Sequence, residues 1–422
     1  MSRFSYSRRL RLSSGDTIPV TIESTDRSGV YNFDILYLMD WMKNNYSYPR
    51  WRIYVLNPDE TINYEIPNED IKIGGSFSEN YQDGQRKSLS FSLYNESGKY
   101  SPNINNFWAN TRLRLDMGLD LVTGETVWFQ AGIYVISNAQ NSLSPSEKAV
   151  QITAKDKFSL FEDKTGTLEG TYEIPVGSDI EEVIKTILLG DMGNGYPFDN
   201  KPIIYHSSLK GKKTQSTISK SAGETYGSIL LDLAVQLSAE IFYNSQGYLT
   251  LMPTNEASHD LDKTLLYDFV AEDGDMGGLD FSFDMNSIIN KIVVVGSSVK
   301  GQVVSAVAVN DDASSPLSYQ KIGYRTGNVI NDSNITTEYL AQERAQYELR
   351  KQLILKSSTT ISIPFNPLLS VNNLIAITSN YFNLSHERFL IQSISCSLDY
   401  SNVMSVTITN VKNLPSIIEK RV

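Results

Sequence analysis

The chain has little of the chemistry on which most enzymes and disulfide-stapled folds depend. Its 422 residues include one cysteine, Cys396, and three histidines, His206, His259 and His386. A single cysteine cannot form an internal disulfide, so a fold held together by such bridges is excluded. Cys396 lies in the run SISCSL, where a small buried residue is the expected role and a nucleophile is the alternative.

Familiar catalytic and metal-binding motifs are missing as well. No CxxC or HExxH pair occurs, and the histidines have no partner at the spacing of metal ligands. There is no GxSxG nucleophile turn and no GK[ST] phosphate loop. The glycine-rich GDMGNG, residues 190–195, follows a predicted helix rather than a strand, so we expect it to end that helix.

Acidic residues are abundant, but their pattern does not identify a functional site. The loop EDGDMGG, residues 272–278, resembles a calcium loop weakly, because acidic ligands do not recur at alternate positions and the closing Glu is absent. We expect a solvated loop there, with a bound metal as the alternative. The 48 Asp and Glu residues are too numerous for the sequence to single out a catalytic pair. The sequence therefore predicts no catalytic, cofactor-binding or metal-binding residue and no cofactor.

Long apolar runs are absent too. No stretch reaches the roughly eighteen apolar residues of a membrane-spanning helix, so no membrane insertion is expected. The N-terminus carries Arg3, Arg8, Arg9 and Arg11 without the apolar segment of a signal peptide, which predicts folding in a cytoplasm. The net charge of −11 disfavours tight, non-specific nucleic-acid binding as the main role.

What the chain does contain is a globular composition rich in strand-forming residues. The apolar share is 41% and the charged share 20%, and the length predicts roughly two to four domains. Residues 1–58 are predicted to be an N-terminal arm, with Phe33, Leu36, Tyr37 and Trp41 on one side of a short helix. That helix either packs on the body of the chain or docks on a neighbouring subunit.

Residues 59–163 predict a first β module. WRIYVLNPDETINYEIP, which leads into it, reads as a hairpin turning at residues 57–60. In KSLSFSLYN, Leu89, Phe91 and Leu93 alternate with polar residues, as in a strand with one buried face. Further strands are expected at IKIGGSFSEN, TRLRLDMGLD, ETVWFQAGIYVISNA and KAVQITAKDKF, and together they predict a small sandwich or barrel.

Residues 164–275 are predicted to form an inserted α+β domain. Ser178 and Glu181 have the spacing of a capping box and would open an amphipathic helix in PVGSDIEEVIKTILLG. A second helix is expected at ETYGSILLDLAVQLSAE. The hairpin after it would turn around residues 244–247.

Residues 276–422 predict a second β module, buttressed by a long helix at 336–355. Strands are expected at KIVVVGSSV, QVVSAVAVN, NLIAITS, RFLIQSISCSL and VMSVTITNV. The helix should bury one stripe, formed by Leu340, Ala341, Ala345, Leu349 and Leu353.

The two β regions also share a spacing. Ile152 follows Ile133 by 19 residues in the first region, and Ile408 follows Phe389 by 19 residues in the last. A similar strand, LRLDMG or LIAITS, precedes each pair. Equal spacing favours an internal duplication, and a chance match between two hairpins is the alternative.

Four stretches together resemble the central baseplate hub proteins of phage tails, which share their plan with the type VI secretion spike. The stretches span roughly residues 65–415. They are SFSLYNESGKYSP with RLRLDMG, GIYVIS and ITAKDKFSLFED; EIPVGSDIEEVIKTIL; ETYGSILLDLAVQLSAEIFYNSQGYLTLMP; and the long helix followed by PFNPLLSVNNLIAITS and FLIQSIS.

The resemblance implies a multidomain, β-rich α+β fold, with two related small β-barrel or sandwich tube modules and an inserted α+β domain. It implies a non-enzymatic virion protein of the tail baseplate, assembled in the bacterial cytoplasm as a homotrimer. Such a hub connects the tail tube to the central spike and organises the baseplate. The implied partners are tail tube or distal tail ring proteins, a central spike or tail lysin, other baseplate proteins, and phage DNA passing through the lumen.

Two other classes of function are open at this point. A cell-wall-degrading tail enzyme would use carboxylates of the middle domain, and the isolated chain would clear a cell-wall substrate. A carbohydrate-binding adhesin at the tail tip would use exposed Tyr and Trp to stack on sugars, but these residues are spread through patterned strands as core residues would be.

Overall fold

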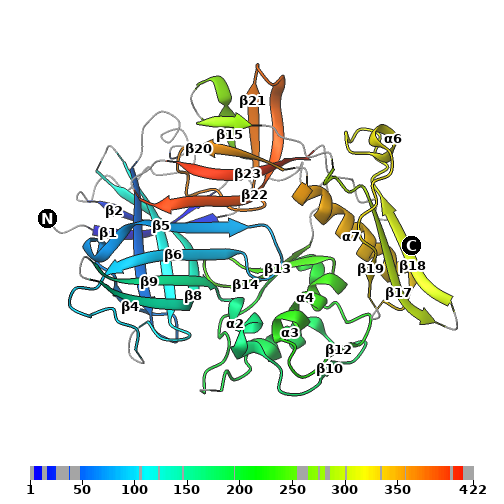
Figure 1. The fold of residues 1–422 in the computed structure, drawn as a ribbon, viewed down its shortest axis with the longest axis horizontal. Helices are drawn as coiled ribbons and strands as arrows, with labels where there is room; N and C mark the ends of the chain where they lie inside the picture. Colours follow the sequence, from blue (N-terminus) through cyan, green and yellow to red (C-terminus); the bar gives the residue numbers. More distant parts are fainter. Residues whose placement is uncertain are drawn as a thin grey trace.

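The computed structural model describes most of the 422-residue chain (Figure 1). The described residues are 4–11, 17–24, 38, 48–103, 107–121, 124–144, 147–193, 195–253, 265–273, 276–280, 286–299, 302–332, 335–356, 358–399 and 403–411. His259 and the predicted helix around Phe33 to Trp41, apart from Leu38, lie outside them.

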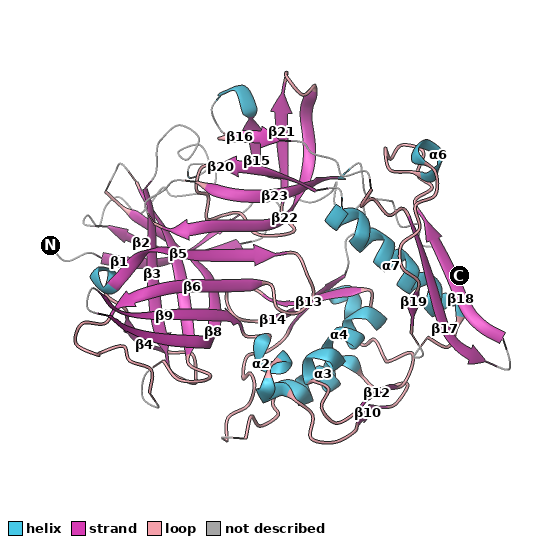
Figure 2. Cartoon of the chain, in the orientation of Figure 1, coloured by secondary structure: helices cyan, strands magenta, loops and turns pink. Residues whose placement is uncertain are grey.

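Strands dominate the described structure, and most belong to one large sheet of fifteen strands (Figure 2). The central path of the sheet runs β16-β20-β23-β22-β5-β6-β9-β8-β7-β3-β4, almost all antiparallel. Its strands are β1 (Phe4–Arg11), β2 (Thr17–Ser24), β3 (Tyr48–Leu56), β4 (Ile62–Glu65), β5 (Ile71–Asn80), β6 (Lys87–Tyr94), β7 (Arg112–Asp120), β8 (Thr126–Ser144), β9 (Glu147–Asp156), β15 (Leu265–Val270), β16 (Gly278–Asp280), β20 (Ser358–Ile363), β21 (Leu374–Ser379), β22 (Leu384–Leu398) and β23 (Met404–Asn410).

Alternation of apolar and polar residues explains the strands of the first β region. In β6 the side chains of Leu89, Phe91 and Leu93 are buried in the core, whereas the serines between them are half-buried. The hairpin predicted around residues 57–60 is confirmed as β3 and β4, and the five strands expected after it are confirmed as β5 to β9. A β-rich fold with large antiparallel sheets is therefore established.

The described strands of the N-terminal region are built into this sheet. β1 and β2 form an antiparallel hairpin, and β2 then pairs with the start of β8. β3 pairs with β7 along its whole length, from Tyr48–Asp120 to Leu56–Arg112.

The first and last β regions meet through backbone pairing. The second half of β22 pairs with β5, from Ser393 opposite Asn80 to Leu398 opposite Gly75. One hydrophobic core contains side chains from both regions, including Phe91 and Ile391. The two regions are thus packed as one body in this chain.

The three strands β7, β8 and β9 have the same antiparallel order as β21, β22 and β23. In each case the second and third strands carry a bulge, after Ile136 in β8 and after Ile391 in β22. The bulges align Tyr134 with Phe389, and both side chains belong to the shared core. The 19-residue spacing instead pairs Phe389 with Ile133, whose side chain lies against Gly247 of the middle region. The match in the sequence is therefore out of step with the strands, by one residue at Phe389 and by two at Ile408, which the bulges align with Ala154.

The middle region has its own core between two helices and small sheets. Its predicted helices and hairpin are confirmed, but the predicted cap is wrong. The side chain of Asp179, not Ser178, accepts from the N–H of Glu182, because Ser178 donates its hydroxyl to the carbonyl of Pro175. The elements are α2 (Ser159–Glu162), η2 (Lys164–Gly166), β10 (Tyr172–Ile174), α3 (Ile180–Leu188), β11 (Ile204–Tyr205), η3 (Ser207–Leu209), β12 (Ile218–Lys220), α4 (Tyr226–Gln236), β13 (Ala239–Tyr243) and β14 (Leu249–Pro253).

The long helix is confirmed as α7 (Glu338–Lys356), within two residues of its predicted bounds. It packs on a separate three-stranded sheet (Figure 1). Ala341 and Ala345 of the helix are fully buried. Leu374 and Leu390 of β21 and β22 complete this third core, so the helix lies between the small sheet and the large one. The nearby elements are η1 (Asn68–Asp70), η4 (Ala271–Asp273), β17 (Lys291–Val299), β18 (Gln302–Val309), α6 (Tyr319–Ile322) and β19 (Ile330–Asn331). Of the helices described, none is long and apolar enough to cross a membrane.

Candidate functional site: buried ionic junctions

The one cysteine is part of the core. Cys396 is buried in β22, and burial, together with the charge of Asp399, raises the pKa of its thiol to about 12. The thiolate is the reactive form of cysteine, so the group is unreactive near neutral pH and packs as a small apolar residue.

The two described histidines lie in different regions of the chain. Nδ1 of His206 accepts a hydrogen bond from the backbone N–H of Ser208 at 3.3 Å, and His206 thereby caps the N-terminus of η3. Nδ1 of His386 is 3.0 Å from Oδ2 of Asp268 at a half-exposed position. Across the described residues, no group of three His, Cys, Asp or Glu side chains is arranged to hold a metal ion.

The acidic loop at 272–278 has a structural contact. The carboxylate of Glu272 accepts from the hydroxyl of Ser379 at 2.8 Å and from the N–H of Tyr381 at 3.2 Å. These donors hold the pKa of Glu272 below its ordinary value. Glu272 thereby fixes the turn between β21 and β22, which displays the exposed ring of Tyr381.

A cluster of buried charged side chains joins the middle region to the large sheet. Lys157 is fully buried at the end of β9, and its Nζ lies 2.6 Å from Glu60 and 2.7 Å from Asp199. It also donates to the carbonyl of Gly247 at 3.0 Å. We call this group, with Arg112 and Lys201, the lysine junction.

The remaining members of the lysine junction complete its hydrogen bonding. Arg112 donates to Glu60 and to the carbonyl of Phe198, each at 3.0 Å, and Lys201 lies 2.5 Å from Glu60. Burial acts to raise the pKa of Glu60, but the two lysines outweigh it, so this pKa is lowered. Burial lowers the pKa of Lys157, and the two carboxylates oppose that effect. Glu60 is therefore ionised near neutral pH.

A second group, the arginine junction, ties three regions together. Nη2 of Arg86 lies 3.0 Å from Glu240 of β13, and both side chains are almost fully buried. Tyr81 donates to the same carboxylate at 2.7 Å, and Asn372 reaches it from the loop before β21 at 3.4 Å. The guanidinium of Arg86 also stacks 3.8 Å from the ring centre of Phe242. The loop 81–86 therefore contacts both the middle region and the last β region.

The same loop reaches the long helix. The hydroxyl of Tyr347 on α7 donates to the carboxylate of Asp83, and Lys351 lies 3.7 Å from it. Gly84 bonds to the carbonyl of Ile241 at a φ of +82°, and a Cβ there would lie 2.9 Å from the ring of Phe158. This close approach, in the left-handed region, requires glycine.

A buried carboxylate underlies the arginine junction. Asp156 accepts from the backbone N–H groups of Arg86, Lys87 and Phe158 at 2.7, 2.8 and 3.1 Å. Burial nevertheless raises its pKa to about 6. A raised pKa is one mark of a catalytic acid, but this carboxylate is fully engaged with backbone donors and organises the chain instead.

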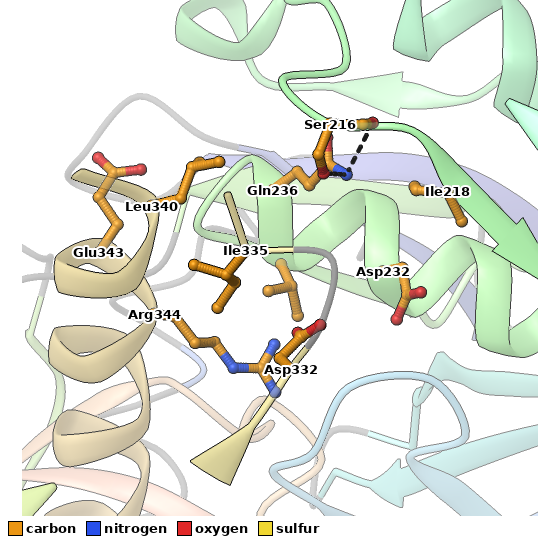
Figure 3. A pocket seen from close by; sticks show the side chains of 10 residues that line it. Ser216, Ile218, Asp232, Gln236, Asp332, Ile335, Leu340, Glu343 and Arg344 are labelled. Carbon is orange, nitrogen blue, oxygen red and sulfur yellow. Dashed lines mark hydrogen bonds between the residues drawn. The ribbon is translucent and has the colours of Figure 1, made fainter. Parts of the chain in front are cut away.

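A small cavity with a mixed polar and apolar lining lies where the middle region meets the long helix (Figure 3). Its volume is about 50 Å³, enough for water but well below the roughly 300 Å³ of ligand pockets. Gln236 donates to the hydroxyl of Ser216 on one side, and Arg344 and Asp332 lie on the other. Burial and the charge of Asp332 raise the pKa of Asp232, although Lys220 and Arg344 oppose this effect.

Taken together, the described site residues hold the regions of the chain in fixed positions. The sequence did not single out Lys157, Glu240 or Asp156, because their partners are distant in the chain. The pattern Lys-Asp-Lys at residues 155–157 after a strand was visible, but nothing in it marks burial.

The fold that these junctions stabilise is that of phage tail proteins, so the resemblance inferred from the sequence is confirmed at the level of fold. The 43 kDa tail protein of prophage MuSo2 from Shewanella oneidensis matches with a TM-score of 0.56 and 13% identity. The match covers 87% of this chain and 99% of that one. A tail protein from Neisseria meningitidis MC58 matches with a TM-score of 0.59 and 9% identity, over 86% of this chain and 99% of the other.

The lidless PdpA–VgrG complex gives a further match, with a TM-score of 0.50 and 14% identity over 89% of this chain and 67% of that one. No family model and no curated protein sequence matches the chain. The relationship is therefore visible in the fold and not in the identity of residues.

Replacing Lys157 by Met is expected to lower the free energy of unfolding by about 3–5 kcal/mol, because Glu60 and Asp199 would stay buried with less compensation. Guanidinium denaturation followed by circular dichroism measures this. Lys185→Met is the matched control: its side chain is 58% exposed and pairs with exposed Glu182, so its effect should stay within about 0.5 kcal/mol. Equal effects of the two substitutions would contradict the role assigned to the lysine junction.

Asp156 should make stability depend on pH in a particular direction. Its folded pKa of about 6 exceeds the ordinary 3.8, so its contribution is fully present below pH 3.8 and is lost as the pH rises through 6. Asp156→Asn replaces one of the two side-chain oxygens that accept from backbone N–H groups, so it is expected to be less stable at every pH. Because the variant cannot titrate, the deficit relative to the parent should be about 1 kcal/mol larger at pH 5 than at pH 7.5. A deficit independent of pH in matched thermal melts would refute the assignment.

Proposed function

We propose that this chain is a structural tail protein, a homotrimeric baseplate hub that connects a tail tube to a central spike, organises the baseplate and lets DNA pass through its lumen. The observation that carries the proposal is the fold match over nearly the whole length of two tail proteins. A match that covers 99% of each relative indicates that the complete architecture is shared, not one common module.

The two strand triples support a role as a symmetry adaptor. Each chain contains β7-β8-β9 and β21-β22-β23 with the same order and a similarly placed bulge. If these belong to two related tube modules, three copies of the chain present six of them. A ring of this kind matches sixfold neighbours on one side and threefold neighbours on the other.

We place the modules at residues 59–163 and 276–422, with an inserted domain at 164–275 and an N-terminal arm at 1–58. The separate core of the middle region supports the insertion, although β15, near the end of this range, pairs with β21 of the second module. The described strands of the arm extend the sheet of the first module through β7 and β8. The two ionic junctions would then make the three parts of each subunit rigid, as an adaptor between two larger structures requires.

The charge of the chain also fits a conduit. A net charge of −11 favours repulsion between the protein and DNA phosphates, so DNA would slide past the wall of a lumen without binding to it. Its location would be the tail baseplate of a virion. The partners would be tail tube or distal tail ring proteins, a spike or tail lysin, and other baseplate proteins.

Light scattering coupled to size-exclusion chromatography tests the proposal directly. We expect a particle of three times the 47.3 kDa of one chain. Electron microscopy of that particle should show threefold symmetry around a central hole. A strictly monomeric chain that joins no tail or spike complex would argue against a hub, and clearing of a cell-wall substrate by the isolated chain would favour the hydrolase.

The helix α7 offers a test of how the subunit supports assembly. Ala345→Pro is expected to cost about 3 kcal/mol or more and to abolish the trimer, because it breaks α7 at a fully buried position. Ala345→Gly at the same site should cost about 1 kcal/mol and leave the trimer intact. Normal trimers from the proline variant would show that α7 is dispensable for assembly.

A further inference from the structure

The lysine junction holds a buried amine against a buried carboxylate. Nζ of Lys157 lies 2.7 Å from Oδ2 of Asp199, and the two side chains are 0% and 1% exposed. Lys157 directly follows β9, whereas Asp199 lies in the middle region between α3 and β11. Two groups that can condense to an amide are therefore fixed next to each other, away from bulk water, where two parts of the chain meet. Such fixed proximity replaces the high concentration that the same reaction would need in solution.

A second carboxylate contacts the same amine. Oε1 of Glu60 is 2.6 Å from Nζ of Lys157, and Glu60 is 6% exposed. The pKa of Glu60 is held below its ordinary value by the lysines that pair with it, so this carboxylate is ionised and free to take up a proton. A carboxylate within hydrogen-bond reach of the proton that must leave has the geometry of a general base.

Burial also favours the nucleophilic form of Lys157. It lowers the pKa of the amine, although the two carboxylates oppose this effect, and a lower pKa increases the neutral fraction. The carbonyl of Gly247 accepts from Nζ at 3.0 Å, and the ring centre of Tyr243 lies 5.0 Å from it. Nζ is thus held at one point by groups from three parts of the chain.

Asp199 has a hydrogen-bond donor on each of its oxygens. The hydroxyl of Tyr243 donates to Oδ2 at 2.9 Å, and the backbone N–H of Lys201 donates to Oδ1 at 3.0 Å. Burial and the charge of Asp199 raise the pKa of Tyr243 well above its ordinary value, so its hydroxyl stays a donor. Negative charge develops on these oxygens when an amine adds to Cγ, and donors already in place stabilise it.

We propose that Lys157 and Asp199 join in an intramolecular amide bond once the chain has folded, with Glu60 as the base that moves the proton. Glu60 takes one proton from the ammonium, and the amine turns about its Cε–Nζ bond toward Asp199. The bond from Nζ to Cγ then forms as the bond from Cγ to Oδ2 breaks. Oδ2 leaves as water with two protons that both come from Nζ, one of them returned by Glu60.

The products are one amide and one water, and no oxidant or cofactor is consumed. The ion pairs of the folded chain set the geometry, and the amide then makes it permanent. The bond would tie the end of β9 to the middle region in a chain whose single cysteine cannot form an internal disulfide. This inference does not rest on the proposed hub function, since it follows from the lysine junction alone.

The intact mass of the full chain, measured under denaturing conditions, tests the bond. We expect a mass lower than that of the sequence by one water molecule. Trypsin does not cleave after a lysine whose amine is acylated or before a proline, so the digest should contain residues 156–164 linked to residues 186–210. Tandem mass spectrometry of this branched peptide locates the link at Lys157 and Asp199.

Variants separate the amide from other losses of water. Lys157→Met should have the full mass of its sequence, and Glu60→Gln should reduce the linked fraction at least tenfold. Lys185→Met is the control, because its exposed amine lies outside the lysine junction, and it should lose water as the parent does. A parent chain of full mass would overturn the proposal. So would a loss that persists in Lys157→Met, as a succinimide at Asp83-Gly84 would give, or a link from Lys157 to Glu60.

Discussion

The ion pairs of Lys157 are the constraint on which the arrangement of the chain depends. The lysine has no access to solvent, so its charge must be matched within the protein. Its partners come from the β3–β4 turn and from the middle region, which are 97 and 42 residues away in sequence. Glu60 reaches it from a left-handed turn position, at a φ of +66°. The middle region therefore has one orientation on the sheet in which no buried charge is left unpaired.

The arginine junction applies the same constraint to the last region. The carboxylate of Glu240 pairs with Arg86 and accepts hydrogen bonds from Tyr81 and Asn372. These partners come from two loops, one in the first β region and one in the last. Buried ionic groups contribute less net stability than apolar packing of equal volume, but they penalise any misaligned arrangement heavily. In this chain they lie where separate cores meet, which is where apolar packing alone would permit sliding.

Local patterns predicted the strands and helices well, because alternation and helical spacing report burial of one face directly. KSLSFSLYN and the 336–355 helix are examples, and both formed as expected. The cap of α3 was misassigned because Ser178 and Asp179 are both good caps, and only the contact of Ser178 with Pro175 decides between them. The junctions were beyond such patterns, since the partners of Lys157 and Glu240 are brought together only by tertiary structure. The tail resemblance was accessible because it depended on the order of elements, which survives at identities of 9 to 13%.

The pairing of β22 with β5 has a consequence for how the chain is made. β5 ends at Asn80, but the strand that covers its edge ends at Leu398. At roughly 5–20 residues per second, a ribosome needs on the order of 15 to 60 s to deliver that strand. Throughout this interval the edge of β5 offers unpaired backbone groups to any extended chain nearby. The nascent polypeptide thus passes through a long, association-prone stage, and completion of the sheet is delayed until translation is almost finished.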